Sequence, residues 1–333
     1  MTMPTARAAP PAETAAASPF HAGEQVLQTR AGVRERAERA GRRMIRDFMP
    51  DEHRALFEAL PYVVIGSLDA RDRPWASLLT GRPGFMRTPD ARTLAIGARP
   101  LADDPLAVHL APGAPLGVLG IELATRRRNR ANGTVIAADG AGFAMHVRQS
   151  FGNCPQYIQA RIPDFAEAAA RAPLPPRAEG ALLSPAAEAV VRAADTFFIA
   201  SASPAARSGG PGEGVDVSHR GGKPGFVRIE TMEGRSVLTA PDFAGNSLFN
   251  TFGNLAANPR AGLLFVDFAA GGVLTLTGRA EIVSDGPEVA AFAGAQRLLR
   301  VFVEDGLWRD GAIPLRWSAP VPAPQIAATG SWS

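Results

Sequence analysis

One heptapeptide pattern occurs twice in this sequence and constrains the fold more than any other feature. Residues 81–87 read GRPGFMR and residues 222–228 read GKPGFVR, an offset of 222 − 81 = 141. A second pair, Asn132-Gly133 and Thr277-Gly278, follows in the same order at an offset of 277 − 132 = 145. Solenoid repeats are shorter, about 20–50 residues, so a single repeat of this length is typical of a duplicated domain. In a chain of 333 residues it predicts two domains of one fold.

The stretch from 214 to 282 shows what that fold contains. Short apolar runs at 225–229, 236–240 and 261–268, and an alternating run at 273–282, predict strands. Between the second and third runs, residues 245–260 have apolar side chains at helical spacing and are expected to form a helix. The connections are too short for a doubly wound parallel sheet, so a small antiparallel barrel with one inserted helix is expected.

Four pieces of this stretch keep the order and spacing of a known family: 218–228 (SHRGGKPGFVR), 241–246 (PDFAGN), 258–265 (NPRAGLLF) and 276–280 (LTGRA). They resemble the FMN-binding split barrel of the pyridoxamine 5′-phosphate oxidase superfamily, in its flavin-nucleotide-binding branch. Residues 153–161 (NCPQYIQAR) are similar to a C-terminal motif of that branch. The resemblance implies a mainly β chain of two tandem split β-barrels with peripheral helices and an N-terminal helical segment, and FMN as the cofactor.

The rest of the chain is divided by composition. Residues 24–60 have a helical pattern in which a second helix begins at Asp51 after Pro50, and residues 287–299 are expected to form a helix after the last alternating run. The expected parts are a disordered N-terminus (1–19), N-terminal helices plus first barrel (20–162), a Pro/Ala-rich linker (163–185), the second barrel (186–317) and a loose tail (318–333).

Composition excludes several classes of protein. Lys and Arg number 35 against 32 Asp and Glu, and no nucleic-acid-binding motif accompanies this small excess, so no nucleic-acid partner is expected. The single cysteine, Cys154, permits no disulfide framework, and five scattered histidines without HxxxH or HxH spacing argue against a metal site. No run approaches 18 apolar residues and no secretory signal opens the chain, so we expect no membrane partner and a cytoplasmic location.

The candidate cofactor residues follow from the resemblance. Family phosphate-binding basic residues lie near Lys223 and Arg228, and a kink at the Pro-Gly pair between them would turn both toward one site. Lys223 as a solvated edge residue is the alternative. The first half has Arg82 and Arg87 at the equivalent places, so either barrel could hold the flavin; the longer match favours the second.

Five further residues complete the predicted cofactor site. Thr239 matches a strand position that contacts flavin, and Ser218 lies in a segment that resembles a lining of the flavin cleft. Asn246 could cap the helix or bind phosphate. Asn250 and Thr251 occupy the place of a basic pair that grips the phosphate in the oxidase, and both are neutral here.

Residues that could carry chemistry are few. His219 is a candidate proton donor, with a solvated turn histidine as the alternative, and Cys154 could face the flavin or be a small buried apolar residue. The basic run 125–130 could hold a phosphate or form a solvated hairpin. No catalytic residue is assigned.

These observations favour an FMN-dependent oxidoreductase acting on a small-molecule substrate. The alternatives are a flavin-binding protein without turnover, for storage or sensing, and a true pyridoxamine 5′-phosphate oxidase, against which the neutral Asn250 and Thr251 argue. In the family the ring lies between two barrels of a homodimer; here the two fused barrels are expected to supply that pair, and a homodimer of the whole chain stays open.

Overall fold

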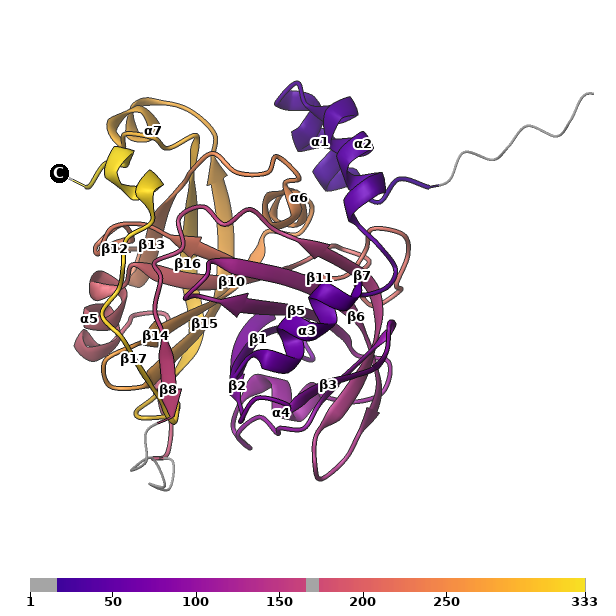
Figure 1. Cartoon of the computed structure of the whole chain (residues 1–333). Helices are drawn as coiled ribbons and strands as arrows, with labels where there is room; N and C mark the ends of the chain where they lie inside the picture. The colour runs from indigo at the N-terminus through magenta and orange to yellow at the C-terminus, as the bar shows by residue number, and fades with distance from the viewer. Residues whose placement is uncertain (1–16, 166–173, 333) are drawn as a thin grey trace, which may run out of the picture.

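Two antiparallel sheets with the same strand order make up the protein (Figure 1). The computed structural model describes residues 17–165 and 174–332. The first sheet has the order β2-β1-β5-β6-β7-β4-β3 and the second β11-β10-β14-β15-β16-β13-β12. The strands of the first are β1 (Tyr62–Leu68), β2 (Pro74–Thr80), β3 (Met86–Asp90), β4 (Thr93–Ile96), β5 (Pro115–Glu122), β6 (Arg127–Ala138) and β7 (Phe143–Gly152). Those of the second are β10 (Thr196–Ala202), β11 (Val215–Gly221), β12 (Arg228–Met232), β13 (Arg235–Asp242), β14 (Arg260–Asp267), β15 (Gly272–Val283) and β16 (Arg297–Arg309). The predicted mainly β fold of two tandem barrels is confirmed.

The repeated sequence pairs mark positions where the backbone needs glycine. Both long central strands are irregular at the second pair, between Asn132 and Gly133 in β6 and between Thr277 and Gly278 in β15. A Cβ atom on Gly133 would lie 1.9 Å from the carbonyl oxygen of His146, and one on Gly278 2.1 Å from that of Phe302. Such an approach excludes any side chain, so the two barrels share a bulge that bends the sheet at the same place.

The heptapeptide itself is a turn. A Cβ on Gly81 would lie 2.4 Å from the ring of Phe85, and one on Gly222 2.3 Å from the ring of Phe226, so each phenylalanine packs over the first glycine of its own motif. The second glycine of each motif has a positive φ, 91° at Gly84 and 82° at Gly225. The recurrence of this motif is therefore explained by turn geometry.

The two barrels share a core. Besides one apolar cluster inside each barrel, a third contains residues of both, among them Val64 and Leu119 from the first and Phe198 and Leu264 from the second. The backbones approach closely there, since a Cβ on Gly262 would lie 2.5 Å from the carbonyl oxygen of Pro74. The barrels therefore pack as one intramolecular pair.

Helices lie around this pair. They are α1 (Ala22–Arg30), α2 (Arg34–Met44), α3 (Asp51–Ala59), α4 (Pro105–His109), α5 (Pro185–Ala193), α6 (Asn250–Ala257), α7 (Pro287–Ala291) and the 3₁₀ helix η1 (Pro324–Ala328). In Figure 1, α1 and α2 lie beside α6 at the top of the molecule. The helix expected over 287–299 ends at Ala291, because Gly294 has φ 84° and β16 begins at Arg297, where pairing with β13 and β15 overrides the helical pattern.

The segments expected as linker and tail make specific contacts. β8 (Pro163–Phe165) pairs with β17 (Leu315–Trp317), and β9 (Arg177–Glu179) pairs with β16. The C-terminal residues lie against the second barrel, where the indole of Trp332 donates a hydrogen bond to the carbonyl of Phe226 at 2.8 Å. The description of 318–333 as loose is therefore corrected up to residue 332. Disorder was expected over 1–19, of which 1–16 lie outside the described residues. None of the described helices has the length and apolar character needed to cross a membrane.

Candidate functional site

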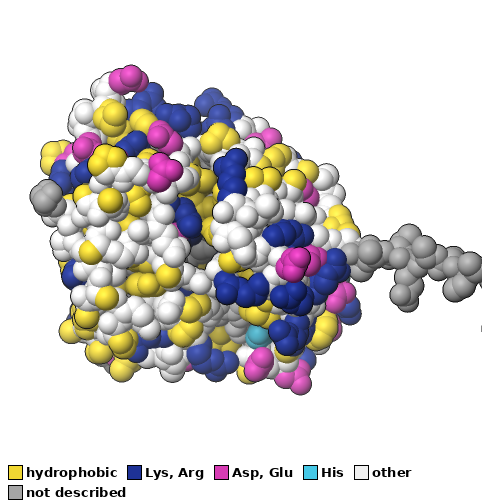
Figure 2. Space-filling view, turned by 90° about the horizontal axis from the view of Figure 1, so that it is seen from above, with side chains coloured by type: hydrophobic (Ala, Val, Ile, Leu, Met, Phe, Trp, Pro, Cys, Tyr) yellow, Lys and Arg dark blue, Asp and Glu magenta, His cyan; other side chains and the backbone are white. Residues whose placement is uncertain are grey.

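A pocket opens where α6 begins, between the two barrels. The second barrel contributes residues 218–221 of β11, residues 241–247 and 249–252 before and in α6, and Gln296 and Arg297 before and in β16. The first barrel contributes Arg128 of β6 and residues from the segment 153–157. The enclosed part measures about 140 Å³. Typical small-molecule sites hold about 300–1,000 Å³, so a ligand of that size would extend beyond the enclosed part. Figure 2 looks down on the face that carries α6 and shows it hollowed near its centre, with Lys and Arg side chains around the hollow.

Aromatic rings form part of the wall. The rings of Tyr157 and Phe243, from different barrels, are stacked at 4.9 Å between centroids and 27° between planes. Phe249 and Phe252 line the pocket at the start of α6. Flat apolar surface of this kind suits a planar ligand, because stacking adds to the free energy of apolar burial.

Positive charge exceeds negative charge in the pocket. Arg220 and Arg297 both form ion pairs with Asp242, the second at 2.8 Å. Arg128 donates from Nε to the carbonyl of Cys154 at 2.8 Å. Burial, together with the charges of Arg130 and Arg220, lowers the pKa of Arg128 to about 9, which leaves it a cation at neutral pH. Three lining guanidinium groups therefore face one carboxylate, and the pocket favours an anion.

Several buried polar atoms in the wall have no hydrogen-bond partner among the residues that the structure describes. They are Nε2 of His219, Nε of Arg220 and Nδ2 of Asn153. His219 is 5% exposed, and burial with the nearby charges of Arg128, Arg220 and Arg161 lowers its pKa well below the usual value. His219 is therefore a buried, neutral imidazole on β11, and the solvated-turn interpretation is corrected. Such buried polar atoms at the wall of a cleft are available to hydrogen-bond a polar ligand.

The loop before α6 is held in a costly conformation. Ser247 and Phe249 have φ of 61° and 64°, and Tyr157 on the opposite wall has φ 61°. A left-handed conformation costs about 1–3 kcal/mol for a residue other than glycine, and such residues cluster at functional sites. Phe249 stands at the N-cap of α6 without a side-chain hydrogen bond, so the first amide groups of the helix lie at the pocket uncapped.

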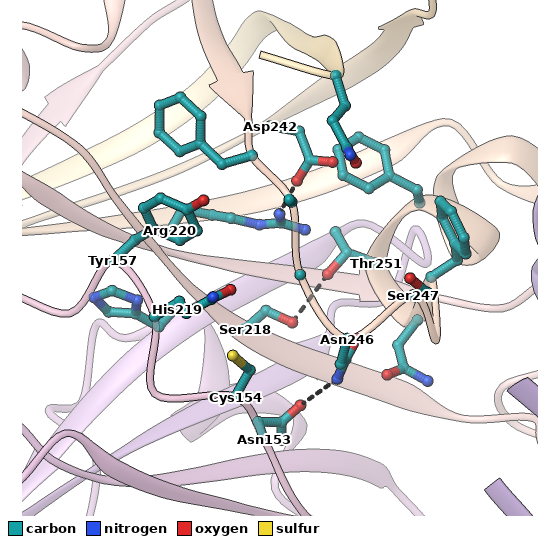
Figure 3. A pocket seen from close by; sticks show the side chains of 18 of the residues that line it. Asn153, Cys154, Tyr157, Ser218, His219, Arg220, Asp242, Asn246, Ser247 and Thr251 are labelled. Atoms are coloured by element: carbon teal, nitrogen blue, oxygen red, sulfur yellow. Dashed lines mark hydrogen bonds and ion pairs between the residues drawn. The ribbon is translucent and has the colours of Figure 1, made fainter. Parts of the chain in front are cut away.

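Four of the seven predicted cofactor residues come together here, and Figure 3 labels three of them, Ser218, Asn246 and Thr251. Ser218, Asn246, Asn250 and Thr251 all line the pocket. The hydroxyls of Ser218 and Thr251 are hydrogen-bonded at 2.9 Å, and Asn246 accepts a bond from the Leu248 amide at 3.1 Å while its own amide lies 3.4 Å from Oδ1 of Asn153.

The other three predicted residues lie elsewhere. Lys223 donates from Nζ to the carbonyl of Thr329. Arg228 pairs with Glu288 and Glu230, and its guanidinium lies 4.4 Å from the ring centroid of Trp332. Thr239 is fully buried, and its hydroxyl has no partner. None of the three lines the pocket, because the motif that contains Lys223 and Arg228 is a turn that carries both toward the C-terminal segment.

Other residues of the pocket had weaker sequence signals or none. Arg220 and Arg128 belonged to segments compared with the flavin cleft or with a phosphate site, and both line the pocket. Arg297 was missed, since it fell within an expected helix. Cys154 also lines the pocket. Among residues 17–165 and 174–332, no group of three or more His, Cys, Asp or Glu side chains could hold a metal ion.

The equivalent place in the first barrel is filled by the protein itself. Ser77 corresponds to Ser218 at the motif offset of 218 − 77 = 141. Its hydroxyl donates to the buried carboxylate of Asp104 at 2.5 Å, and Arg309 lies 3.7 Å from the other oxygen of that carboxylate. The buried carboxyl of Asp104, whose pKa is raised by burial, therefore occupies the place beside Ser77, whereas Ser218 faces the cationic pocket.

Comparison with known proteins supports a relationship for the second half. The family model described as pyridoxamine 5′-phosphate oxidase matches residues 183–306. No curated protein matches the chain. Solved structures with some similarity include HupZ of Group A Streptococcus, with 11% identity, coverage of 37% of this chain and 90% of that one, and a TM-score of 0.28. The heme storage protein HutZ of Vibrio cholerae has 15% identity, 39% and 95% coverage and a TM-score of 0.26. An FAD-binding protein of Mesorhizobium loti has 14% identity, 41% and 99% coverage and a TM-score of 0.26.

Proposed function

Because the second barrel belongs to the pyridoxamine 5′-phosphate oxidase-related family, we propose that this protein binds a flavin nucleotide in the pocket between its barrels. FMN is the flavin nucleotide that we propose. The observation that carries the proposal is that three arginines and one carboxyl group line a pocket whose wall is partly aromatic, which leaves the pocket with an excess of positive charge. FMN combines a planar ring with a phosphate of about −1.5 to −2 charge, and the pocket is complementary to both.

The residues present fit such a ligand. Arg220 and Arg297, with the uncapped amides at the start of α6, are the groups that would hold a phosphate. They supply the charge that the neutral Asn250 and Thr251 lack. The stacked Tyr157 and Phe243 offer the ring an apolar neighbour, and the unpartnered donor of Asn153 is available to its polar edge.

An oxidoreductase acting on a small molecule is the activity we propose. The flavin, when bound, supplies the electron or hydride transfer, and the protein's part is to bind, orient and shield it. His219 is neutral at pH 7 because its pKa is lowered, so it can donate or accept one hydrogen bond without bringing a charge. The charged groups that shift the pKa of His219 are Arg128, Arg220 and Arg161, with no carboxylate of the described residues among them, which favours the second candidate, a flavin-binding protein without turnover. A cytoplasmic location and an optional homodimer complete the proposal.

Absorption spectroscopy and titration test the proposal together. We expect purified protein to be yellow, or to quench the fluorescence of added FMN, and to bind FMN at least tenfold more tightly than riboflavin. FAD serves as the third ligand, because it keeps the ring and replaces the terminal phosphate by a diester. A colourless protein that leaves FMN fluorescence unchanged would refute flavin binding, and a Soret band would indicate a porphyrin instead.

A further inference from the structure

The N-terminal helix α1 lies in backbone contact with α6, the helix that begins at the pocket. A Cβ atom on Gly23 would lie 2.2 Å from the carbonyl oxygen of Gly253, and one on Gly253 would lie 2.4 Å from Cγ of Glu24. Only two glycines facing each other permit this approach. The first helical segment of the chain is thus fitted to a helix more than 220 residues away, beside which it lies in Figure 1.

Two side chains of α1 reach past this contact to the pocket loop. The amide of Gln28, which is 0% exposed, donates to the carbonyl of Leu248 at 3.0 Å. The carboxyl oxygen Oε1 of Glu24 accepts a hydrogen bond from the side-chain amide of Asn250 at 2.5 Å. Leu248 stands between the two left-handed residues Ser247 and Phe249, so these bonds fall on the most strained part of the loop.

The side chain of Leu248 is held from the same direction. It is 1% exposed and belongs to an apolar cluster with Phe20 and Ala37 of the N-terminal segment and Phe151 of β7. Gln28 is itself fixed by Arg34, which donates to its side-chain oxygen at 3.1 Å. Loop conformations with two left-handed residues persist only where surrounding contacts over-determine them, and here those contacts come from α1 and α2.

We propose that α1 is a positioning element for the ligand pocket, with Gln28 and Glu24 holding residues 246–251 in the conformation that presents the first amides of α6. Neither residue lines the pocket; they act through Leu248 and Asn250. The identity of the ligand in this inference rests on the proposed function. The contacts by which Gln28 and Glu24 hold residues 246–251, called the clamp below, do not depend on any ligand.

The test uses Gln28→Met in the full chain, with Gln25→Met as the matched control. Gln25 lies on the same helix, and its amide also donates to a backbone carbonyl, but to that of Phe20 at 2.7 Å and not to one of residues 246–251. Amide hydrogen exchange of residues 246–252 is measured without ligand. Losing one buried hydrogen bond of about 1.4 kcal/mol corresponds to a tenfold change, so we expect exchange about tenfold faster in Gln28→Met and unchanged in Gln25→Met.

FMN and riboflavin titrations form the second measurement. Misplaced helix amides weaken phosphate binding, so Gln28→Met is expected to reduce the preference for FMN over riboflavin, whereas a general loss of folding would weaken both equally. If Gln28→Met fails to fold, Gln28→Asn takes its place. Asparagine keeps the amide group, but its side chain is one methylene too short to reach the carbonyl of Leu248. Unchanged exchange over 246–252 in a folded Gln28 variant would overturn the clamp. Faster exchange in a protein whose wild type binds no flavin would uphold the clamp and refute the proposed function.

Discussion

Replacing Arg297 by glutamine separates phosphate binding from fold stability, because β16 provides a matched control three residues further on. Arg297 and Arg300 have similarly buried side chains, 19% and 17% exposed, and each pairs with carboxylates. Arg297 lines the pocket through its position beside Asp242, whereas Arg300 contacts Glu288 and Glu281 outside it. The two substitutions remove the same chemical group from one strand and differ in whether the ligand can reach it.

The expected magnitude follows from the loss of one charge-assisted contact. A hydrogen bond to a charged group contributes about 1.5–3 kcal/mol, and 1.4 kcal/mol corresponds to tenfold in affinity. Arg297→Gln should therefore weaken FMN binding by about ten- to a hundredfold and leave riboflavin affinity within about twofold. Arg300→Gln should leave both affinities unchanged, although it also lowers stability by breaking ion pairs.

Fluorescence-quenching titrations of both variants with FMN and riboflavin, at low and at raised salt, make the measurement. Salt should weaken FMN binding to the wild type more than riboflavin binding, since screening acts on the phosphate at the open mouth. Parallel loss of FMN and riboflavin affinity in Arg297→Gln would show that the arginine supports the fold and not the phosphate. An effect of Arg300→Gln equal to that of Arg297→Gln would refute the assignment of the pocket.

Three further predictions concern other parts of the molecule. Arg228→Ala should lower the melting temperature by a few degrees and leave the preference for FMN over riboflavin unchanged, because the partners of Arg228 lie outside the pocket. A loss of that preference would show that Arg228 belongs to the binding site. Calorimetry should give one flavin per chain, since the Asp104 carboxylate occupies the place beside Ser77; a stoichiometry of two would contradict this. Burial, reinforced by the charge of Asp216, raises the pKa of Glu24 well above its usual value. The folded state then favours the protonated form, so stability from this group is complete below about pH 4 and is lost as pH rises through the folded pKa. Glu24→Gln should match the wild type near pH 4 and unfold at a higher temperature at neutral pH; the opposite order in thermal melts would refute the shift.

The parts of the fold that could be predicted are those encoded by local spacing. Gly133 and Gly278 recur because each faces a carbonyl oxygen at a bulge, and Gly84 and Gly225 recur because each has a positive φ. Such requirements apply to single positions and remain visible in a sequence. The succession of strands along the chain, the inserted helix and the internal repeat could therefore be inferred from the sequence, whereas the order of the strands within each sheet could not.

The cation cluster of the pocket could not be predicted in the same way. Arg220, Asp242 and Arg297 are on three different strands, and they meet because β13 pairs with β16 from Asp242 opposite Arg297. The spacing of residues in the sequence does not predict the register between β13 and β16. Arg297 also lies in a segment with a helical pattern, whose strand pairing was decided by its neighbours in the sheet. Lys223 and Arg228 were chosen on a motif whose recurrence has a structural cause.

Comparison of the two halves helps to separate residues required by the fold from residues that form the pocket. Positions that both halves share are explained by the fold, whereas positions that differ between them can serve binding. Ser77 and Ser218 are equivalent and both buried. The first is hydrogen-bonded to the carboxyl group of Asp104, and the second to Thr251 and to the guanidinium of Arg130. An added anion would find the Ser77 hydroxyl already bonded to Asp104, whereas the place beside Ser218 is lined by guanidinium groups that attract it. If the protein binds the phosphate-bearing ligand proposed above, this difference between two equivalent strands favours the pocket beside Ser218.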